Sequence, residues 1–327
     1  MNSRRRLLLA LAAGAFAGPP ALAQQQNRMR RIGFLSGANA STMSDNLAAF
    51  RMGMAELGWS DRRDYVIDER YSDANAKVVP GLLAELLATQ PDLLLLPGNE
   101  VVRLFLNQTR TLPIVFAIAQ DPVGAGLVAS LQRPGGNATG LASLSNDLAA
   151  KRLQLLKEAL PRIAHVAVLF PGDEFGSLPE VKAIEEAGAR LKIRVTRGAL
   201  RQRSDIEAAF KRGASLGAQA YLMVQGGFMG ANDAAIVELA TRLRVPSVSY
   251  RAGSVQAGAL MSYAASNPDN FRRAAGYVDK ILKGAKPGEL PIEQPVKFEM
   301  VINMRTAKAM GLTIPQSILL RADRVIE

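Results

Sequence analysis

The chain has 327 residues, with 40 Lys and Arg against 29 Asp and Glu, a formal net charge of +11, one His and no Cys. The absence of Cys excludes a cysteine nucleophile, a disulfide and a cysteine-borne lipid anchor, and the single His excludes a His-rich zinc site. Basic residues are spread along the chain without a basic block and interleaved aromatics, so we expect no nucleic-acid partner.

The first 23 residues have the three parts of a cleavable export signal. Arginines at 4–6 precede an apolar run at 7–17, and a small-x-small end at 21–23 follows. The apolar run is too short to span a bilayer. We therefore expect residues 1–23 to be a signal peptide, residues 24–30 to be a linker, and the mature protein to work in a bacterial periplasm. Generic Sec export is favoured over the twin-arginine route, whose motif is matched only loosely.

Beyond the linker, short apolar runs alternate with amphipathic helical patterns, which is typical of a parallel sheet covered by helices on both faces. In the first series we expect strands over residues 31–35, 65–71, 92–96 and 113–118. Apolar side chains at helical spacing predict one helix that ends at Gly58, one over 79–90, and one that starts near Asn99.

The alternation of strands and helices begins again after a turn-rich segment at 133–137. This indicates two successive βα series, each with its own sheet, rather than one long sheet. The expected strands are 164–170, 193–197, 220–224 and 245–250, and the expected helices are 148–160, 179–190, 204–216 and 233–243. Ser204 and Glu207 predict a capping box, and Asn267 with Pro268 predicts the start of a further helix. His165 opens a buried strand, so we interpret it as a structural residue bonded to backbone rather than a catalytic one.

Three segments suit crossings between two lobes, namely residues 138–144, 259–263 and 294–301. Three crossings would form a hinge. Lobe 1 would then comprise residues 31–140 with about 264–294, and lobe 2 would comprise residues 141–263 with about 295–327.

Several segments are similar to one known family. Residues 121–140, beginning Asp121-Pro122-Val123-Gly124, and the closing stretches 271–284 and 307–315 resemble a family of ABC-transporter substrate-binding proteins. The similarity covers essentially the whole mature chain. It implies the type I periplasmic binding protein fold of the tryptophan- and tyrosine-type members, an α/β fold with two Rossmann-like lobes on parallel sheets and a three-strand hinge. It also implies that a small ligand is captured and delivered to an ABC permease in the inner membrane.

Ligands of open α/β sheets bind beyond the carboxyl ends of the strands, where helix N-termini present unpaired N–H groups. Two facing lobes would bring two such edges together. The expected ligand-binding residues follow the strands: Ser36, Asn39, Gly98, Asn99, Gln120 and Asp121 in lobe 1, and Asp173, Gln225, Gly226, Tyr250 and Arg251 in lobe 2.

An amino-acid-like ligand needs an acceptor for its ammonium group and donors for its carboxylate. Asp121 or Asp173 can supply the acceptor, although both positions also suit an ordinary turn. Ser36 and Asn99 can supply donors, and Arg251 can either pair with an anionic ligand or stand solvated in a loop.

Three aromatic residues are candidates for stacking on an aromatic ligand: Tyr250, Tyr263 and Phe228. Core packing is the alternative for each. Trp59 follows a helix-ending glycine and is expected to cover the core at a loop, outside the site.

The chain departs from the family where the ligand should lie. The family often has Gly followed by a small hydroxyl residue after the third strand, whereas Gly98 precedes Asn99 and Glu100 here. The glycine-rich pieces match neither dinucleotide-binding nor phosphate-loop spacing, so no cofactor and no metal are expected.

We therefore expect a monomeric binding protein and no enzymatic activity. A sensor protein that presents a solute to a membrane receptor remains an alternative. An exported α/β hydrolase-like enzyme would need a catalytic pair or metal cluster that the sequence does not offer, and a transcription regulator would need a helix-turn-helix ahead of the first lobe.

Overall fold

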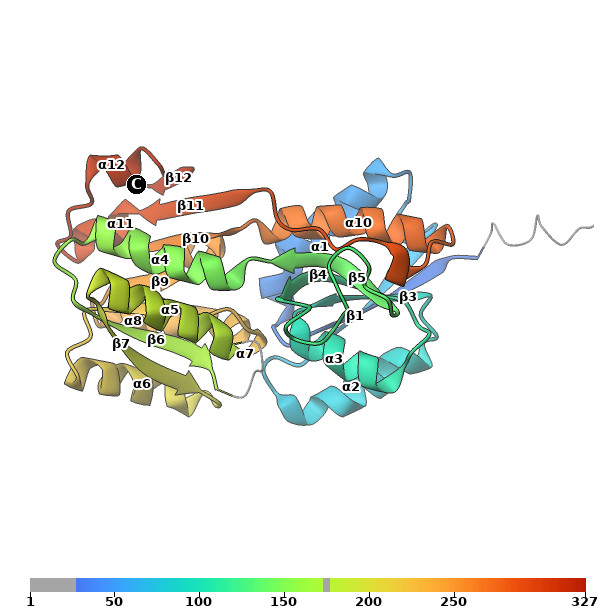
Figure 1. Ribbon diagram of the computed structural model, residues 1–327, viewed down its shortest axis with the longest axis horizontal. Coiled ribbons are helices and arrows are strands. Elements are labelled where there is room, and N and C mark those ends of the chain that lie inside the picture. The colour runs from blue at the N-terminus through green and yellow to red at the C-terminus, as the bar shows by residue number, and fades with distance from the viewer. Residues whose placement is uncertain (1–27, 173–176) are drawn as a thin grey trace, which may run out of the picture.

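A computed structural model describes residues 28–172 and 177–327. The predicted signal peptide, most of the predicted linker and Asp173 lie outside the described residues. The described chain forms two α/β lobes side by side (Figure 1), which confirms the predicted two-lobed α/β fold.

The first lobe contains a five-stranded sheet in the order β2-β1-β3-β4-β5, with every neighbouring pair parallel. Its strands are β1 (Arg30–Ser36), β2 (Tyr65–Tyr71), β3 (Leu93–Pro97), β4 (Ile114–Gln120) and β5 (Ala138–Ser143). The central strands are buried on both faces, which explains why they appear in the sequence as continuous apolar runs.

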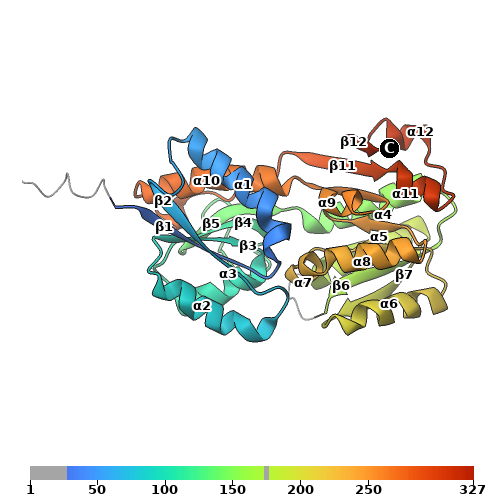
Figure 2. The same cartoon turned by 180° about the vertical axis from the view of Figure 1, so that it is seen from behind.

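Alternating side chains of these strands build two separate cores, because successive residues of a strand point to opposite faces. Leu93 and Leu95 pack with α1 (Ala40–Glu56) and α10 (Asn267–Leu282). Leu94 and Leu96 pack with α2 (Val79–Ala88) and α3 (Asn99–Gln108) on the other face. Figures 1 and 2 show α10, which comes late in the chain, beside α1.

The second lobe contains a seven-stranded sheet in the order β12-β11-β10-β9-β8-β6-β7. Its strands are β6 (His165–Pro171), β7 (Arg194–Leu200), β8 (Ala220–Met223), β9 (Ser247–Ser249), β10 (Met261–Ala265), β11 (Phe298–Asn303) and β12 (Arg324–Ile326). The helices of this lobe are α4 (Ser145–Ala159), α5 (Ser177–Leu191), α6 (Ser204–Ser215), α7 (Gly227–Ala231), α8 (Asp233–Arg242), α9 (Ala252–Gln256), α11 (Met304–Ala309) and α12 (Gln316–Leu319). Short 3₁₀ turns lie at η2 (Ala76–Val78) and η3 (Pro287–Glu289).

The second sheet is not wholly parallel, because β10 and β11 run antiparallel. The C-terminal end of β10 leads into α10 of the first lobe, and the N-terminal end of β11 returns from that lobe. Both ends must therefore face the first lobe, so the two neighbouring strands run in opposite directions.

Within the described residues the chain passes between the lobes three times. The first passage runs from β5 into α4 at residues 143–145, and the second runs from β10 into α10 at 265–267. The third runs from the end of α10 through η3 into β11, over residues 283–297. The sheet of the first lobe continues to Ser143, and β10 stays in the second sheet as far as Ala265.

Three local predictions differ from the structure. The predicted capping box is wrong: α6 has no side-chain cap, and the Asp205 carboxylate instead accepts the backbone N–H groups of Arg201 and Gln202 at 2.8 and 3.1 Å. The cap of α10 is Ser266, one residue before the predicted Asn267. His165 is bonded to a side chain, with Nε2 2.7 Å from Thr196 Oγ1 on β7.

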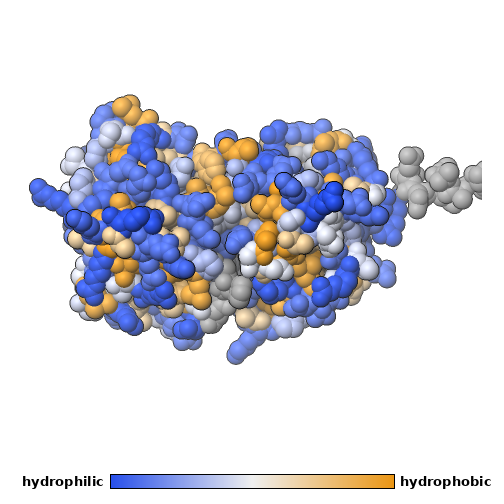
Figure 3. Space-filling view, in the orientation of Figure 1, coloured by the Kyte–Doolittle hydropathy of each residue, from blue (hydrophilic) through white to orange (hydrophobic). Residues whose placement is uncertain are grey.

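The face of the molecule seen in Figure 3 is mainly hydrophilic, with hydrophobic residues in scattered groups. In the part of the chain that the structure describes, none of the helices has the length and apolar character needed to cross a membrane.

Gly53 lets α1 and α10 approach each other closely. A Cβ atom on Gly53 would lie 2.4 Å from the Arg272 carbonyl oxygen, whereas a Cβ on Gly276 of α10 would meet nothing within 4 Å. We expect Gly53→Ala to lower the free energy of unfolding by about 1–3 kcal/mol through overpacking. Gly276→Ala should raise it by about 0.5–1 kcal/mol, because alanine loses less backbone entropy in a helix. Urea denaturation of both variants tests this, and a change of the same sign in both would contradict it.

Candidate functional site

A cavity of about 340 Å³ lies between the lobes, within the range of about 300–1,000 Å³ that is usual for small-molecule sites. The carboxyl ends of β1, β3 and β4 line it from the first lobe, together with the start of α1. The segments after β8 and β9 line it from the second lobe, and the second passage closes one side. The lining includes Ser36, Thr42, Asn46, Gly98, Ile118, Gln225, Tyr250, Arg251 and Asn267.

Most of the predicted site residues lie together in this lining. They are Ser36, Gly98, Asn99 and Gln120 from the first lobe and Gln225, Gly226, Tyr250 and Arg251 from the second. Asn39 and Asp121 lie outside the lining, and Asp173 lies outside the described residues.

Asn39 and Asp121 have other partners. The Asn39 side chain caps α1 by accepting the Thr42 N–H at 3.0 Å, and it donates to the Ala231 carbonyl in the second lobe at 3.3 Å. Asp121 is exposed, has a φ of +39°, and accepts the Gly124 N–H at 3.0 Å. The structure therefore gives Asn39 a contact between the lobes and Asp121 a place in a turn.

Asn99 positions its neighbour within the lining. Its amide nitrogen donates to the Gln120 carbonyl at 2.5 Å, and its amide oxygen accepts the Gln120 N–H at 2.8 Å. This pair of bonds ties the end of β3 to the end of β4 and uses both polar atoms of the side chain. Ser36, on the adjacent strand, accepts the Ala38 N–H at 3.1 Å, so its hydroxyl hydrogen can still be donated to a ligand.

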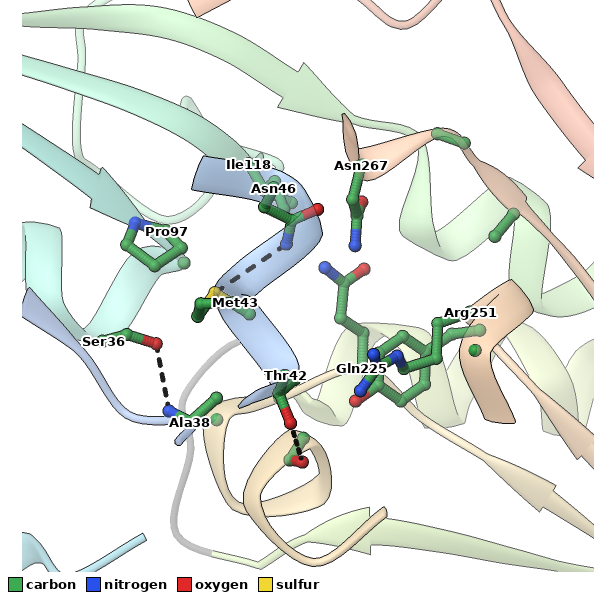
Figure 4. Close-up of a pocket in the computed structure, with 18 of the residues that line it drawn as sticks. Ser36, Ala38, Thr42, Met43, Asn46, Pro97, Ile118, Gln225, Arg251 and Asn267 are labelled. Carbon is green, nitrogen blue, oxygen red and sulfur yellow. Dashed lines mark hydrogen bonds between the residues drawn. The ribbon is translucent and has the colours of Figure 1, made fainter. Parts of the chain in front are cut away.

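Gln225 is oriented by hydroxyl groups at the first passage between the lobes. Its amide oxygen accepts from Ser145 Oγ at 3.2 Å, and Ser145 Oγ lies 2.6 Å from Ser143 Oγ. Its amide nitrogen is therefore available as a donor. Figure 4 shows Gln225, Arg251 and Asn267 gathered on one side of the cavity, opposite Ser36 and Pro97.

Of the three aromatic candidates, Tyr250 lies in the lining and the other two do not. Tyr263 stacks on Phe298 with ring centroids 6.3 Å apart, and Phe228 packs against the core of the second lobe. Trp59 lies elsewhere in the first lobe, where its indole N–H donates to Asp279 at 2.8 Å.

Sequence reasoning missed the residues that α1 and the second passage contribute. Thr42, Met43 and Asn46 project from α1, and Asn267 starts α10. The sequence did contain a pointer to Asn46, because it is a polar residue on the otherwise apolar helix face that includes Leu47 and Phe50. The structure shows that this face is buried.

The lobes touch directly beside the cavity. Thr42 Oγ1 donates to the Gly230 carbonyl of α7 at 3.0 Å, in addition to the bond from Asn39 to Ala231. A Cβ on Gly37 would lie 3.4 Å from the Gly227 Cα. The described conformation is therefore one in which the two lobes are closed against each other.

Comparisons with known proteins agree with this geometry. The sequence model of the family described as ABC transporter substrate binding protein matches residues 35–326. The chain belongs to the ABC transporter substrate-binding proteins.

Relatives of this substrate-binding protein include characterised and solved examples. A tyrosine-binding protein of Clostridioides difficile (strain R20291) is 23% identical over 287 residues, which cover 87% of this chain and 82% of the relative. A domain from Streptococcus pneumonia, solved in complex with L-Trp, has 24% identity and a TM-score of 0.84, covering 91% of this chain and 100% of that one. A conserved domain protein from Vibrio cholerae has 22% identity, a TM-score of 0.85 and the same coverage. The solved structures confirm the type I periplasmic binding protein fold.

Within residues 28–172 and 177–327, no three His, Cys, Asp or Glu side chains are grouped to hold a metal ion.

Arg152 of α4 donates a hydrogen bond to Glu180 of α5, and both side chains are almost completely buried in the second lobe. Arg152 also donates to the Tyr263 carbonyl on β10 at 3.3 Å, and the Gln225 backbone interacts with the Glu180 carboxyl group and favours its charged form. The pair therefore connects β10, which leads into the second passage, with a residue of the cavity lining.

Burial raises the pKa of Glu180 from its ordinary 4.5 to about 7, although Arg152 opposes this by lowering it. The folded protein therefore keeps a proton that the unfolded chain releases between these two values. We expect the free energy of unfolding to fall as the pH rises through this interval, by on the order of 2 kcal/mol. Glu180→Gln should remove this contribution.

Urea denaturation of both proteins from pH 4.5 to 7.5 measures the contribution as the difference between the two pH profiles. Parallel profiles would contradict the assignment.

Proposed function

We propose that this protein is the solute-binding component of an ABC importer, which binds a small amino-acid-like molecule in the interlobe cavity and delivers it to the permease. Aromatic amino acids are the first candidates, because a relative is named for tyrosine, a neighbour was solved with L-Trp, and Tyr250 faces the cavity here. In this proposal the protein is exported by its N-terminal signal, acts in the periplasm as a monomer, and carries out no catalysis.

The observation that carries the proposal is that both lobes line one cavity and meet beside it. A ligand that contacts both lobes binds the closed state more tightly than the open state, so it shifts the population toward closure. The moving units would be lobe 1, residues 31–140 with about 264–294, and lobe 2, residues 141–263 with about 295–327. The permease would then distinguish the closed, loaded form from the open one.

Calorimetric titration of the purified protein against the twenty L-amino acids and small carboxylates tests ligand binding. Small-angle scattering in the same conditions tests closure, and native mass spectrometry of freshly purified protein tests for a co-purified ligand. We expect binding of at least one amino acid together with a smaller radius of gyration. Failure of every compound to bind or to compact the protein would contradict the proposal.

The bond from Thr42 to Gly230 provides a separate test of closure. Thr42→Val keeps the branched side chain but replaces the hydroxyl with a methyl group, which removes a hydrogen bond worth about 1 kcal/mol. Because this bond joins the lobes, we expect ligand affinity to fall by about fivefold. Thr89→Val is the matched control, since Thr89 bonds to Leu86 within one lobe. Equal effects of the two substitutions on affinity would argue against closure as the cause.

A further inference from the structure

The cavity has a charged wall on the side of the second lobe. Arg251 follows β9, and its side chain is 23% exposed in the lining. Arg324 also reaches the lining, but its side chain is 42% exposed and pairs with Glu299 at 3.6 Å. Arg251 is thus the more enclosed of these two cations.

A chain of polar contacts fixes Arg251 in place. Asp233, at the start of α8, lies 3.8 Å from its guanidinium and accepts from Ser254 Oγ at 2.6 Å. Ser254 in turn accepts from Ser249 Oγ at 2.7 Å, and Ser249 accepts the backbone N–H of Arg251 at 3.3 Å. These contacts hold both the backbone and the charged group of Arg251, so its guanidinium is oriented before any ligand arrives.

Asp233 holds Arg251 by charge rather than by a direct hydrogen bond, because 3.8 Å exceeds the usual 2.7–2.9 Å of a charge-assisted bond. Among the described residues, the Arg251 guanidinium donates no hydrogen bond. A guanidinium has five N–H groups in a fork that matches the two oxygens of a carboxylate. The N–H groups of the Arg251 guanidinium are therefore available to bind a group within the cavity.

Gln225 extends the same donor surface. Its amide oxygen is occupied by Ser145, which leaves the amide nitrogen to donate into the cavity beside Arg251 (Figure 4). The acidic lining residues are Asp45 and Glu100 of the first lobe and Glu299 of the second, and Glu299 pairs with Arg324. The lining thus offers N–H donors around Arg251 and carboxylates on the opposite lobe, which suits a zwitterion.

We propose that Arg251 binds the carboxylate of the ligand, held in position by Asp233, and that the natural ligand is consequently a small carboxylic acid such as an α-amino acid. This inference rests on the proposed function, because it assumes that a solute occupies the interlobe cavity. It assigns a chemical role to one residue and predicts that analogues without a carboxylate are rejected.

The test compares each ligand with a matched analogue that lacks the negative charge. The amino acid that binds the wild-type protein most tightly is titrated again as its carboxamide, and L-tyrosine and L-tryptophan are compared with tyramine and tryptamine. We expect the analogues without a carboxylate to bind about 100-fold more weakly, because the Arg251 guanidinium then has no carboxylate to pair with in the cavity.

Arg251→Gln should lower the affinity for the amino acid by a similar factor and leave the affinity for the carboxamide nearly unchanged. The variant would then no longer distinguish the two compounds. Asp233→Asn keeps the charge of Arg251 and loosens its orientation, so it should weaken binding of the acid by about tenfold. Arg321→Gln is the control, because Arg321 lies outside the cavity lining and pairs with Glu158 on the surface. Circular dichroism establishes that each variant is folded, and Asp233→Asn keeps the test decisive if Arg251→Gln does not fold.

Two outcomes would overturn the inference while leaving solute binding intact: equal affinities of the wild-type protein for the acid and its carboxamide, or unchanged affinity of Arg251→Gln for the acid. If no carboxylate, amine or neutral compound binds, the proposed function is contradicted. The inference, which depends on that function, is then contradicted as well.

Discussion

The carboxyl ends of two sheets face one another across a single cavity, and every feature of the site depends on this arrangement. Only three passages of backbone connect the lobes in the described chain, whereas the direct contacts beside the cavity are few, with Thr42 and Asn39 bonded to α7. A ligand that bridges the lobes adds free energy to the closed state alone, which allows a binding event to be signalled as a change of shape.

Much of the polar chemistry around the cavity positions other groups. Asn99 fixes Gln120, Ser145 orients Gln225, and Asp233 holds Arg251. The buried pair of Arg152 and Glu180 lies behind Gln225 and joins it to β10. Such supporting contacts keep the lining in one arrangement, which reduces the conformational entropy lost when a ligand binds.

The sequence predicted the two-lobed fold well, because strands that are buried on both faces are apolar at successive positions. Such runs can be recognised without knowledge of the tertiary contacts. Most of the residues that the sequence predicted for the site also lie in the cavity lining, because in a parallel sheet the residues after each strand must share one edge. Choices among hydrogen-bond partners were less predictable. The Asp205 carboxylate accepts backbone N–H groups just before α6, where the sequence predicted a capping box of Ser204 and Glu207. The Asp121 side chain accepts an N–H group within its own turn and not a group of the ligand site. The contribution of Asn46 and Asn267 depends on how the helices and the second passage pack, which local sequence patterns do not reveal.

The central claim is that a solute draws the two lobes together, and a distance measurement between them tests it most directly. The chain has no Cys, so spin labels can be placed at Lys77→Cys in the first lobe and Ser204→Cys in the second, both exposed positions. Pulsed electron paramagnetic resonance would then give the distribution of distances with and without a saturating ligand. We expect a broad distribution that becomes narrower and shorter when the ligand binds. An unchanged distribution in the presence of bound ligand would contradict the account.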